Sequence, residues 1–324
     1  MVFHSIEMQP NRFTVRVPTE KIPGDRYQQP PLWVACCKLD LAEVERLLEL
    51  IPLIDVDERG GVWSKTALHV CMGEGILNTQ VRGEGSRTND ELLEDLNCIV
   101  HLLLNKGADP IAYSNSWETP LHDACRYNTT SNNLDQILCS RPHLDVNCRD
   151  RYGRTPLYLS AREGRRHVME KLLANGANPS IATRLGVTVL HTPVCKADMR
   201  LLIAHGADVN ARSLDGLTPL HHALQMFRRT RFDTVRHLEM FEWVRDLLSF
   251  KPNLFIPNHN DVTAPHMDLG QDEMAMNVKE LFADYWNNLK LSFVMGLHER
   301  VGAGTHVRDL DNEIVRMICE QVWD

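Results

Sequence analysis

Short apolar stretches with a helical period alternate with polar, glycine-containing turns along most of the chain. Segments 41–50, 98–107 and 167–176 place apolar side chains three or four positions apart, as amphipathic helices do. Glycine stands where such helices end in a left-handed residue, at positions 107, 176 and 206. The pattern predicts an all-α protein whose helices are joined by short β-hairpin turns.

A four-residue phrase begins a new helical unit seven times. It reads PPLW at 30–33, TALH at 66–69, TPLH at 119–122, TPLY at 155–158, TVLH at 188–191, TPLH at 218–221 and TAPH at 263–266. Successive copies begin 36, 53, 36, 33, 30 and 45 residues apart. Threonine followed by proline starts a helix well, because threonine caps free backbone N–H groups and the N–H that proline lacks would have no partner. A single unit cannot bury its own apolar face, so the units are expected to stack.

A second phrase precedes most copies of the first, for example HGADVNARSLDG at 205–216. Two phrases in fixed order, with a period close to 33 residues, resemble the ankyrin repeat family. The resemblance covers residues 30–285 and implies about seven stacked units. It leaves a leader at 1–29 and a C-terminal helical tail at 286–324.

In the ankyrin family, the histidine of the first phrase joins the turns of adjacent repeats by hydrogen bonds. The resemblance implies this structural role for His69, His122, His191 and His221. A metal site is the alternative, but one imidazole per repeat sets the rings a repeat apart instead of around one ion. We therefore expect a structural role and no metal at these positions.

The resemblance also implies a protein–protein interaction module, which binds a partner protein through hairpin tips and first helices. Large apolar residues stand at the tips where small or polar ones are usual: Trp63, Trp117, Tyr152, Leu185 and Leu214. Aromatic side chains are typical of binding hot spots. Local packing is the alternative for these residues, above all for Trp117, which replaces the family's glycine and is a candidate to plug its own turn.

Two units are longer than the period. The second has 20 extra residues within 73–95, a polar stretch expected to loop out, and the sixth has 12 around 226–241. The sixth unit contains the densest basic cluster of the chain: Arg228, Arg229, Arg231 and Arg236. This cluster is a candidate patch for an acidic partner. The alternative is a solvated helix extension anchored by Phe227, Phe232 and Phe241.

The tail predicts two further helices, the second over 310–323. Its sequence VRDLDNEIVRMICEQV, at 307–322, is similar to the opening helix of an F-box, with Asp311 in place of the usual proline. A truncated F-box follows the repeats of PRANC-type ankyrin proteins and docks on the Skp-type adaptor of a cullin ubiquitin ligase. The resemblance implies this contact for Leu310, Ile314 and Ile318. The alternative is that both helices only cap the open end of the stack.

Composition narrows the function classes. The formal net charge of −8 argues against non-specific nucleic-acid binding. The sequence has no run of about 20 apolar residues, so we expect no membrane span. Nine cysteines without a CxxC pair or a secretory signal indicate reduced thiols, so we expect a cytoplasmic or nuclear protein.

No catalytic motif is present, and no cofactor or enzymatic activity is expected. Cys36, Cys71 and Cys125 fall in first helices where the family has alanine, which predicts core packing. The stretch LIAHGADVN at 202–210 resembles the pattern around asparagines that are hydroxylated in ankyrin repeats, which makes Asn210 a candidate modification site.

Overall fold

The computed structural model describes residues 29–50, 54–73, 89–127, 130–230, 232–267, 269 and 274–285. The chain divides into unit 1, Met1–Leu214, and unit 2, Asp215–Asp324. Within the described ranges every regular element is a helix, and extended pairing is limited to the isolated bridges Gly60–Lys65 and Pro257–Thr263. The predicted all-α class is confirmed.

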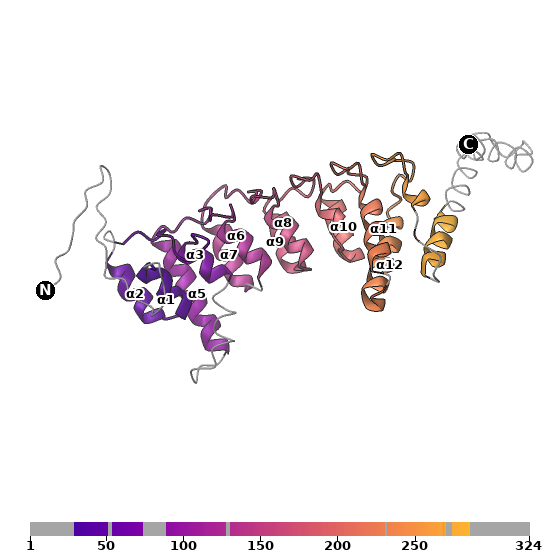
Figure 1. The fold of residues 1–324 in the computed structure, drawn as a ribbon. Coiled ribbons are helices and arrows are strands. Elements are labelled where there is room, and N and C mark those ends of the chain that lie inside the picture. The colour runs from indigo at the N-terminus through magenta and orange to yellow at the C-terminus, as the bar shows by residue number, and fades with distance from the viewer. Residues whose placement is uncertain are drawn as a thin grey trace, which may run out of the picture. The chain divides into compact units, whose positions relative to one another are not determined.

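Helices of unit 1 come in pairs (Figure 1). The first members are α1 (Pro31–Lys38), α3 (Ala67–Met72), α6 (Pro120–Arg126), α8 (Pro156–Arg162) and the 3₁₀ turn η1 (Val189–His191). The second members are α2 (Leu41–Glu49), α5 (Asn89–Asn105), α7 (Ser131–Cys139), α9 (Arg166–Ala174) and α10 (Lys196–Ala204). The first members α1, α3, α6 and α8 pack on one another in sequence order, and α2, α5, α7 and α9 do the same in a second layer.

The repeated phrase explains both the starts of the first helices and their packing. Thr155 caps α8, because its hydroxyl accepts from the N–H of Tyr158 at 3.2 Å, and Pro156 takes the first helical position. The leucine of the phrase is almost completely buried, as Leu121 and Leu157 show. Burial of one such side chain stabilises a fold by about 1.5–3 kcal/mol. Each copy therefore supplies both a helix start and a core contact.

The copy at 188–191 departs from the expected pattern, because it forms a single 3₁₀ turn instead of a helix. Pro193 has no N–H to donate to the carbonyl of Val189, and it drives Thr192 into an extended conformation with φ −93° and ψ 149°. The hydroxyl of Thr192 donates to the Val189 carbonyl at 2.6 Å instead. The phrase therefore starts a helical turn, and the following proline prevents it from continuing as a helix.

The insertion at 73–95 is partly helical. Its last seven residues, 89–95, form the first turns of α5, so the expected polar loop does not extend over them; residues 74–88 lie outside the described ranges. Asp90 and Glu91 occupy the first turn, where negative charge favours a helix N-terminus. The buried Leu96 continues the same helix into the core.

Unit 2 contains α11 (Pro219–Arg229), α12 (Thr234–Leu248), the 3₁₀ turn η2 (Ala264–His266) and a helix over 274–285. The insertion at 226–241 lengthens α11 and α12, which pack against each other. Phe227 is fully buried, and its ring stacks on that of His237 with centroids 4.0 Å apart. Phe232 is 86% exposed in the turn between the helices, so its expected role as an anchor is wrong.

Candidate protein-binding surface

The five apolar tip residues of unit 1 all reach solvent. We call them the tip row; they are 51–69% exposed and comprise Trp63, Trp117, Tyr152, Leu185 and Leu214. Most large apolar side chains of the repeats are buried, so exposure of one at every tip is not a general property of the chain. A series of large exposed apolar side chains along one edge of a repeat array is typical of an interaction site.

Backbone hydrogen bonds connect each tip to the next. The N–H of Asn115 donates to the carbonyl of Trp63 (2.9 Å), and that of Arg151 donates to Ser116 (3.2 Å). The same type of bond joins the next two pairs of tips, from Arg184 to Tyr152 (2.9 Å) and from Leu214 to Leu185 (2.9 Å). The tips are therefore held in one continuous series instead of moving as separate loops.

Trp117 occupies an unusual backbone position. Its φ is 59°, in the left-handed region where Gly153 and Gly186 stand at the corresponding positions of the next two tips. A side chain in this region costs about 1–2 kcal/mol relative to the right-handed conformation. The indole is 61% exposed, and its ring centroid lies 6.0 Å from that of Tyr113. The expectation that Trp117 plugs its own turn does not fit a side chain that is mainly in solvent.

His69, His122 and His221 join neighbouring turns, as the sequence predicts. Nδ1 of His69 accepts from the N–H of Thr66 (3.2 Å), and Nε2 contacts the carbonyl of Glu118 (3.0 Å) in the next repeat. Because a carbonyl only accepts, Nε2 carries the proton of a neutral ring. His122 contacts the carbonyl of Arg154 at 3.1 Å in the same way. Burial lowers the pKa of His69 to about 4 and also lowers the pKa of His122.

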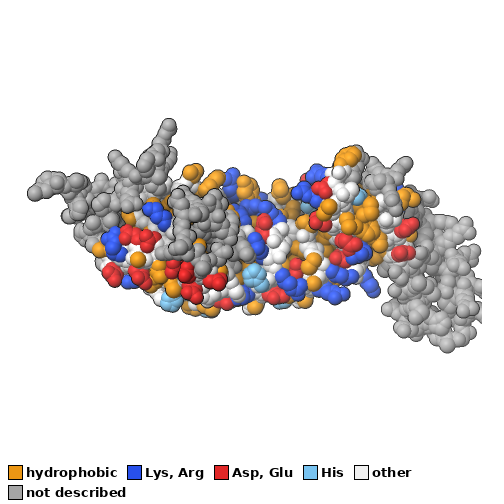
Figure 2. Space-filling view, turned by 90° about the horizontal axis from the view of Figure 1, so that it is seen from below, with side chains coloured by type: hydrophobic (Ala, Val, Ile, Leu, Met, Phe, Trp, Pro, Cys, Tyr) orange, Lys and Arg blue, Asp and Glu red, His pale blue; other side chains and the backbone are white. Residues whose placement is uncertain are grey.

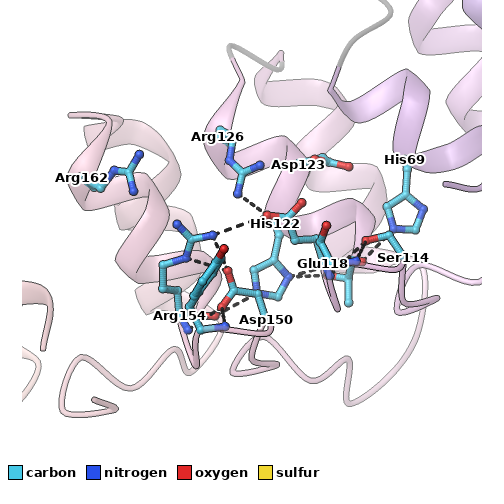
Figure 3. Close-up of polar contacts among 12 residues, drawn as sticks. His69, Ser114, Glu118, His122, Asp123, Arg126, Asp150, Arg154 and Arg162 are labelled. Carbon is cyan, nitrogen blue, oxygen red and sulfur yellow. Dashed lines mark hydrogen bonds and ion pairs between the residues drawn. The ribbon is translucent and has the colours of Figure 1, made fainter. Parts of the chain in front are cut away.

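A polar network that the sequence did not predict lies between the third and fourth repeats (Figure 3). The buried Glu118 forms ion pairs with Arg126, from α6, and with Arg154 (3.6 Å), from the next tip. Arg154 also binds the buried Asp150 at 2.6 Å. Ion pairs with limited access to water are strong only when hydrogen bonds satisfy both partners. Asp150 accepts from several donors, and Glu118 accepts from the Arg126 guanidinium. The network fixes one tip relative to the next.

A second buried ion pair joins the second and third repeats. Nζ of Lys65 lies 3.2 Å from the carboxylate of Asp123, which is fully buried on α6. Burial raises the pKa of Asp123 to about 7, and the Lys65 ammonium partly offsets this effect. Removing either partner would leave an uncompensated charge in the interior, so the pair has a structural role.

The described residues do not form a cluster of side chains suited to catalysis or metal binding. Cys36, Cys71 and Cys125 are fully buried in first helices, which confirms their packing role. Burial raises the pKa of Cys125 well above its ordinary value, so its thiol is a poor nucleophile. No group of three or more His, Cys, Asp or Glu side chains within those ranges is arranged to hold a metal ion.

The basic cluster of the sixth unit lies on the lengthened helices of unit 2. Arg228 and Arg229 are exposed at the end of α11, and Arg236 is exposed on α12, where it pairs with Asp233 at 3.5 Å. Arg231 lies outside the described residues. The cluster is therefore accessible at the three described positions, which keeps it a candidate patch.

Comparison with known families decides what the repeats are. Family models for ankyrin repeats match residues 92–183, with three copies, and residues 199–243. Residues 92–183 and 199–243 are ankyrin repeats. The matched residues include Trp117, Tyr152 and Leu214, and Leu185 lies between the two matched ranges.

Curated proteins with similar ankyrin repeats differ widely in length from this chain. The mouse B-cell lymphoma 3 protein homolog is 28% identical over 201 residues, which cover 60% of this chain and 40% of that protein. Human Rabankyrin-5 is 33% identical over 133 residues, covering 39% of this chain and 11% of that protein. The chain thus spans less than half the length of each of these relatives.

Solved ankyrin structures show the same fold. The ankyrin repeat domain of Bcl-3, described as a unique member of the IkappaB protein family, is similar with a TM-score of 0.57 and 23% identity. That match covers 79% of this chain and 98% of the Bcl-3 domain. The human ASB11 ankyrin repeat domain has a TM-score of 0.53 and 20% identity, covering 78% and 97% of the two chains.

Several predicted sites lie beyond what the structure describes or stay untested. Leu310, Ile314 and Ile318 fall in 286–324, outside the described residues. Asn210 lies half-buried in a turn, where its N–H donates to the carboxylate of Asp208 at 2.8 Å, and its hydroxylation stays a prediction. Among the described helices, none is both long and apolar enough to cross a bilayer.

Proposed function

We propose that this ankyrin repeat protein binds a partner protein along the tip row of unit 1 and has no enzymatic activity of its own. The observation that carries the proposal is the exposed apolar side chain at every tip, held in series by tip-to-tip backbone hydrogen bonds. A preorganised row of this kind binds without the cost of ordering mobile loops. Aromatic members such as Trp63 and Tyr152 supply the large contact area that hot spots need.

The test compares proteins captured from a cell lysate by the full chain and by a variant with Trp63→Ala and Tyr152→Ala. Both side chains are more than half exposed, so we expect the variant to fold normally and to lose its main partner. A matched control is Val235→Ala, an exposed apolar residue of α12 in unit 2, which should keep the partner. Capture of the same proteins in equal amounts by all three would contradict the proposal.

A second, more specific role is a substrate-recruiting adaptor of a cullin-type ubiquitin ligase. It is supported by the F-box-like sequence at 307–322, in which Leu310, Ile314 and Ile318 have the spacing that predicts one face of a helix. In this role the tip row holds the substrate and the tail binds a Skp-type adaptor. The alternative is a scaffold or inhibitor whose C-terminal helices only cap the stack.

The variant Ile314→Asp/Ile318→Asp distinguishes these two roles. Loss of a Skp-type adaptor and cullin from the captured proteins, with cooperative thermal unfolding preserved, supports the adaptor role. Absence of both ligase components from the wild-type sample supports the scaffold role. The exposed free thiols of Cys98, Cys139 and Cys195 support a cytoplasmic or nuclear location, where such thiols stay reduced.

A further inference from the structure

Positive charge is concentrated at three consecutive tips of unit 1. Residues 149–154, 182–187 and 211–214 contain five arginines and one acidic residue, Asp150, and the exposed Asp215 follows directly after the third range. The chain as a whole has a formal net charge of −8, so this distribution is opposite in sign to the rest of the molecule. The arginines are Arg149, Arg151, Arg154, Arg184 and Arg212.

The two acids at these tips, Asp150 and Asp215, do not balance the five arginines. Asp150 is buried, and its carboxylate accepts from the backbone N–H groups of Tyr152 (2.9 Å) and Arg154 (2.8 Å) and from the Arg154 guanidinium (2.6 Å). Asp150 therefore neutralises Arg154 and closes its own turn. Arg149, Arg151 and Arg184 are exposed, and none of the three makes an ion pair within the described part of the chain.

Acidic side chains gather elsewhere in unit 1. Figure 2 shows them over the N-terminal repeats of that unit, where α2 and α5 lie. The exposed acids of these repeats are Asp40, Glu45, Glu49, Glu58, Asp90, Glu91 and Glu94. This separation of charge gives the later tips a positive field of their own, which raises the local concentration of an acidic partner.

Apolar side chains alternate with the cations at the same tips. Tyr152, Leu185 and Leu214 are exposed beside the arginines. The guanidinium carbons of Arg151 and Arg154 lie 4.9 and 4.7 Å from the centroid of the Tyr152 ring, within the range of cation–π attraction. These contacts hold both charges next to an apolar surface instead of leaving them on flexible stems.

We propose that these three tips bind an extended, acidic segment of the partner protein, in which Asp or Glu alternates with large apolar residues. The proposal rests on the proposed function and names the chemistry of its ligand. Packed helices lie about 8–10 Å apart, and an extended chain advances about 3.3 Å per residue. Successive tips therefore meet about every third residue of the segment, with acids between the apolar contacts facing Arg151 and Arg184.

A nucleic acid is the other polyanion that exposed arginines attract. It fits these tips less well, because Leu185 and Leu214 offer no aromatic face on which a base can stack. The net negative charge of the chain also opposes a long polyanion more than a short acidic peptide.

The test starts from a displayed library of random peptides of about 16 residues, selected on the full-length chain. We expect the selected peptides to hold about twice the library's share of Asp and Glu, with apolar residues about three positions apart. The most enriched peptide, made synthetically, should bind the Arg151→Glu/Arg184→Glu variant at least about tenfold more weakly than the wild type. This loss is larger than that expected from mutating one charge at the rim of an interface, because two charges are reversed. Its affinity should fall several-fold between about 50 and 500 mM salt.

Controls separate this proposal from the proposed function. Arg200→Glu reverses an exposed charge on the second helix α10 and should leave the affinity unchanged. The selected peptides could instead be apolar, without acidic enrichment, and lose binding only to the Tyr152→Ala/Leu185→Ala variant. That result would contradict the proposed acidic segment and still support the tip row as the binding surface. If that apolar variant binds every selected peptide normally, the tip row itself is wrong. Tighter binding of a polyuridine oligonucleotide through the same arginines would also overturn the proposal.

Discussion

At the scale of single residues, the tips differ in how well their side chains suit the backbone. Gly153 and Gly186 hold the left-handed position of their turns with φ of 77° and 75°, without the strain that a Cβ atom brings. Trp117 holds the same position with φ 59° and leaves most of its ring in water. Strain of this kind is often found where a side chain serves binding.

Trp117→Gly is expected to keep or raise the free energy of unfolding, by up to about 1 kcal/mol, because the glycine removes the left-handed strain. It should also weaken partner binding, since the exposed indole is lost. The matched control is Tyr152→Gly, which removes an exposed aromatic residue from a tip position without positive φ and should lower the free energy by about 0.5–1 kcal/mol. Denaturant unfolding measures both. Destabilisation by Trp117→Gly as large as that by Tyr152→Gly would show that the backbone position is not strained.

The buried histidines make stability depend on pH. The pKa of His69 is lowered by burial from 6.5 to about 4, so below pH 6.5 the unfolded chain binds a proton that the folded chain does not. The contribution of His69 to stability is therefore fully present above about pH 6.5 and falls as the pH decreases toward 4. Asp123 acts in the opposite sense between pH 4 and 7, because burial raises its pKa to about 7.

His69→Gln isolates the histidine contribution, since glutamine does not titrate. Between pH 7.5 and 4.5, the variant should lose about 2–3 kcal/mol less free energy of unfolding than the wild type does. Denaturant titrations at both pH values give the two differences. Equal losses in the two proteins would mean that His69 titrates normally in the fold.

At the scale of helices, local signals predict some elements well and others poorly. The starts of α6, α8 and α11 follow from Thr–Pro, because the cap and the first helical residue are adjacent in the sequence. The copy at 188–191 forms only the short turn η1 because Pro193 follows it. Pro193 lies outside the four-residue phrase, so a comparison of the phrases does not reveal this difference. The start of α5 was missed for a similar reason, because it lies in a polar insertion outside the repeated phrases.

The lengthened pair α11–α12 allows a direct comparison of two phenylalanines. Phe227 is fully buried and stacks on His237, so Phe227→Ala should destabilise unit 2 by about 3–5 kcal/mol. Phe232→Ala removes a side chain that is 86% exposed and should change stability by less than about 0.5 kcal/mol. Thermal unfolding of the two variants measures the difference, and similar effects would contradict the described packing of this helix pair.

At the scale of the whole molecule, the sequence predicted which residues stand at the tips but not how the tips are connected. The five tip residues precede recognisable helix starts, so their place in the fold follows from local pattern. The contacts of Glu118 with Arg126 and Arg154, and the tip-to-tip hydrogen bonds, depend on the register in which repeats stack. Arg151 and Arg184 stand 33 positions apart in the sequence, and their shared surface appears only once that register is known.

Direct evidence for the proposed binding surface requires that the tip row of unit 1 contacts the partner protein. Site-specific photo-crosslinking in cells tests it most directly, with a photoreactive amino acid placed at Tyr152, at Leu185 or, as a control, at the exposed Glu170 of the second helix α9. We expect one common crosslinked protein from Tyr152 and Leu185 and none of it from Glu170. Crosslinks to a partner from Glu170 alone, with none from either tip, would contradict it.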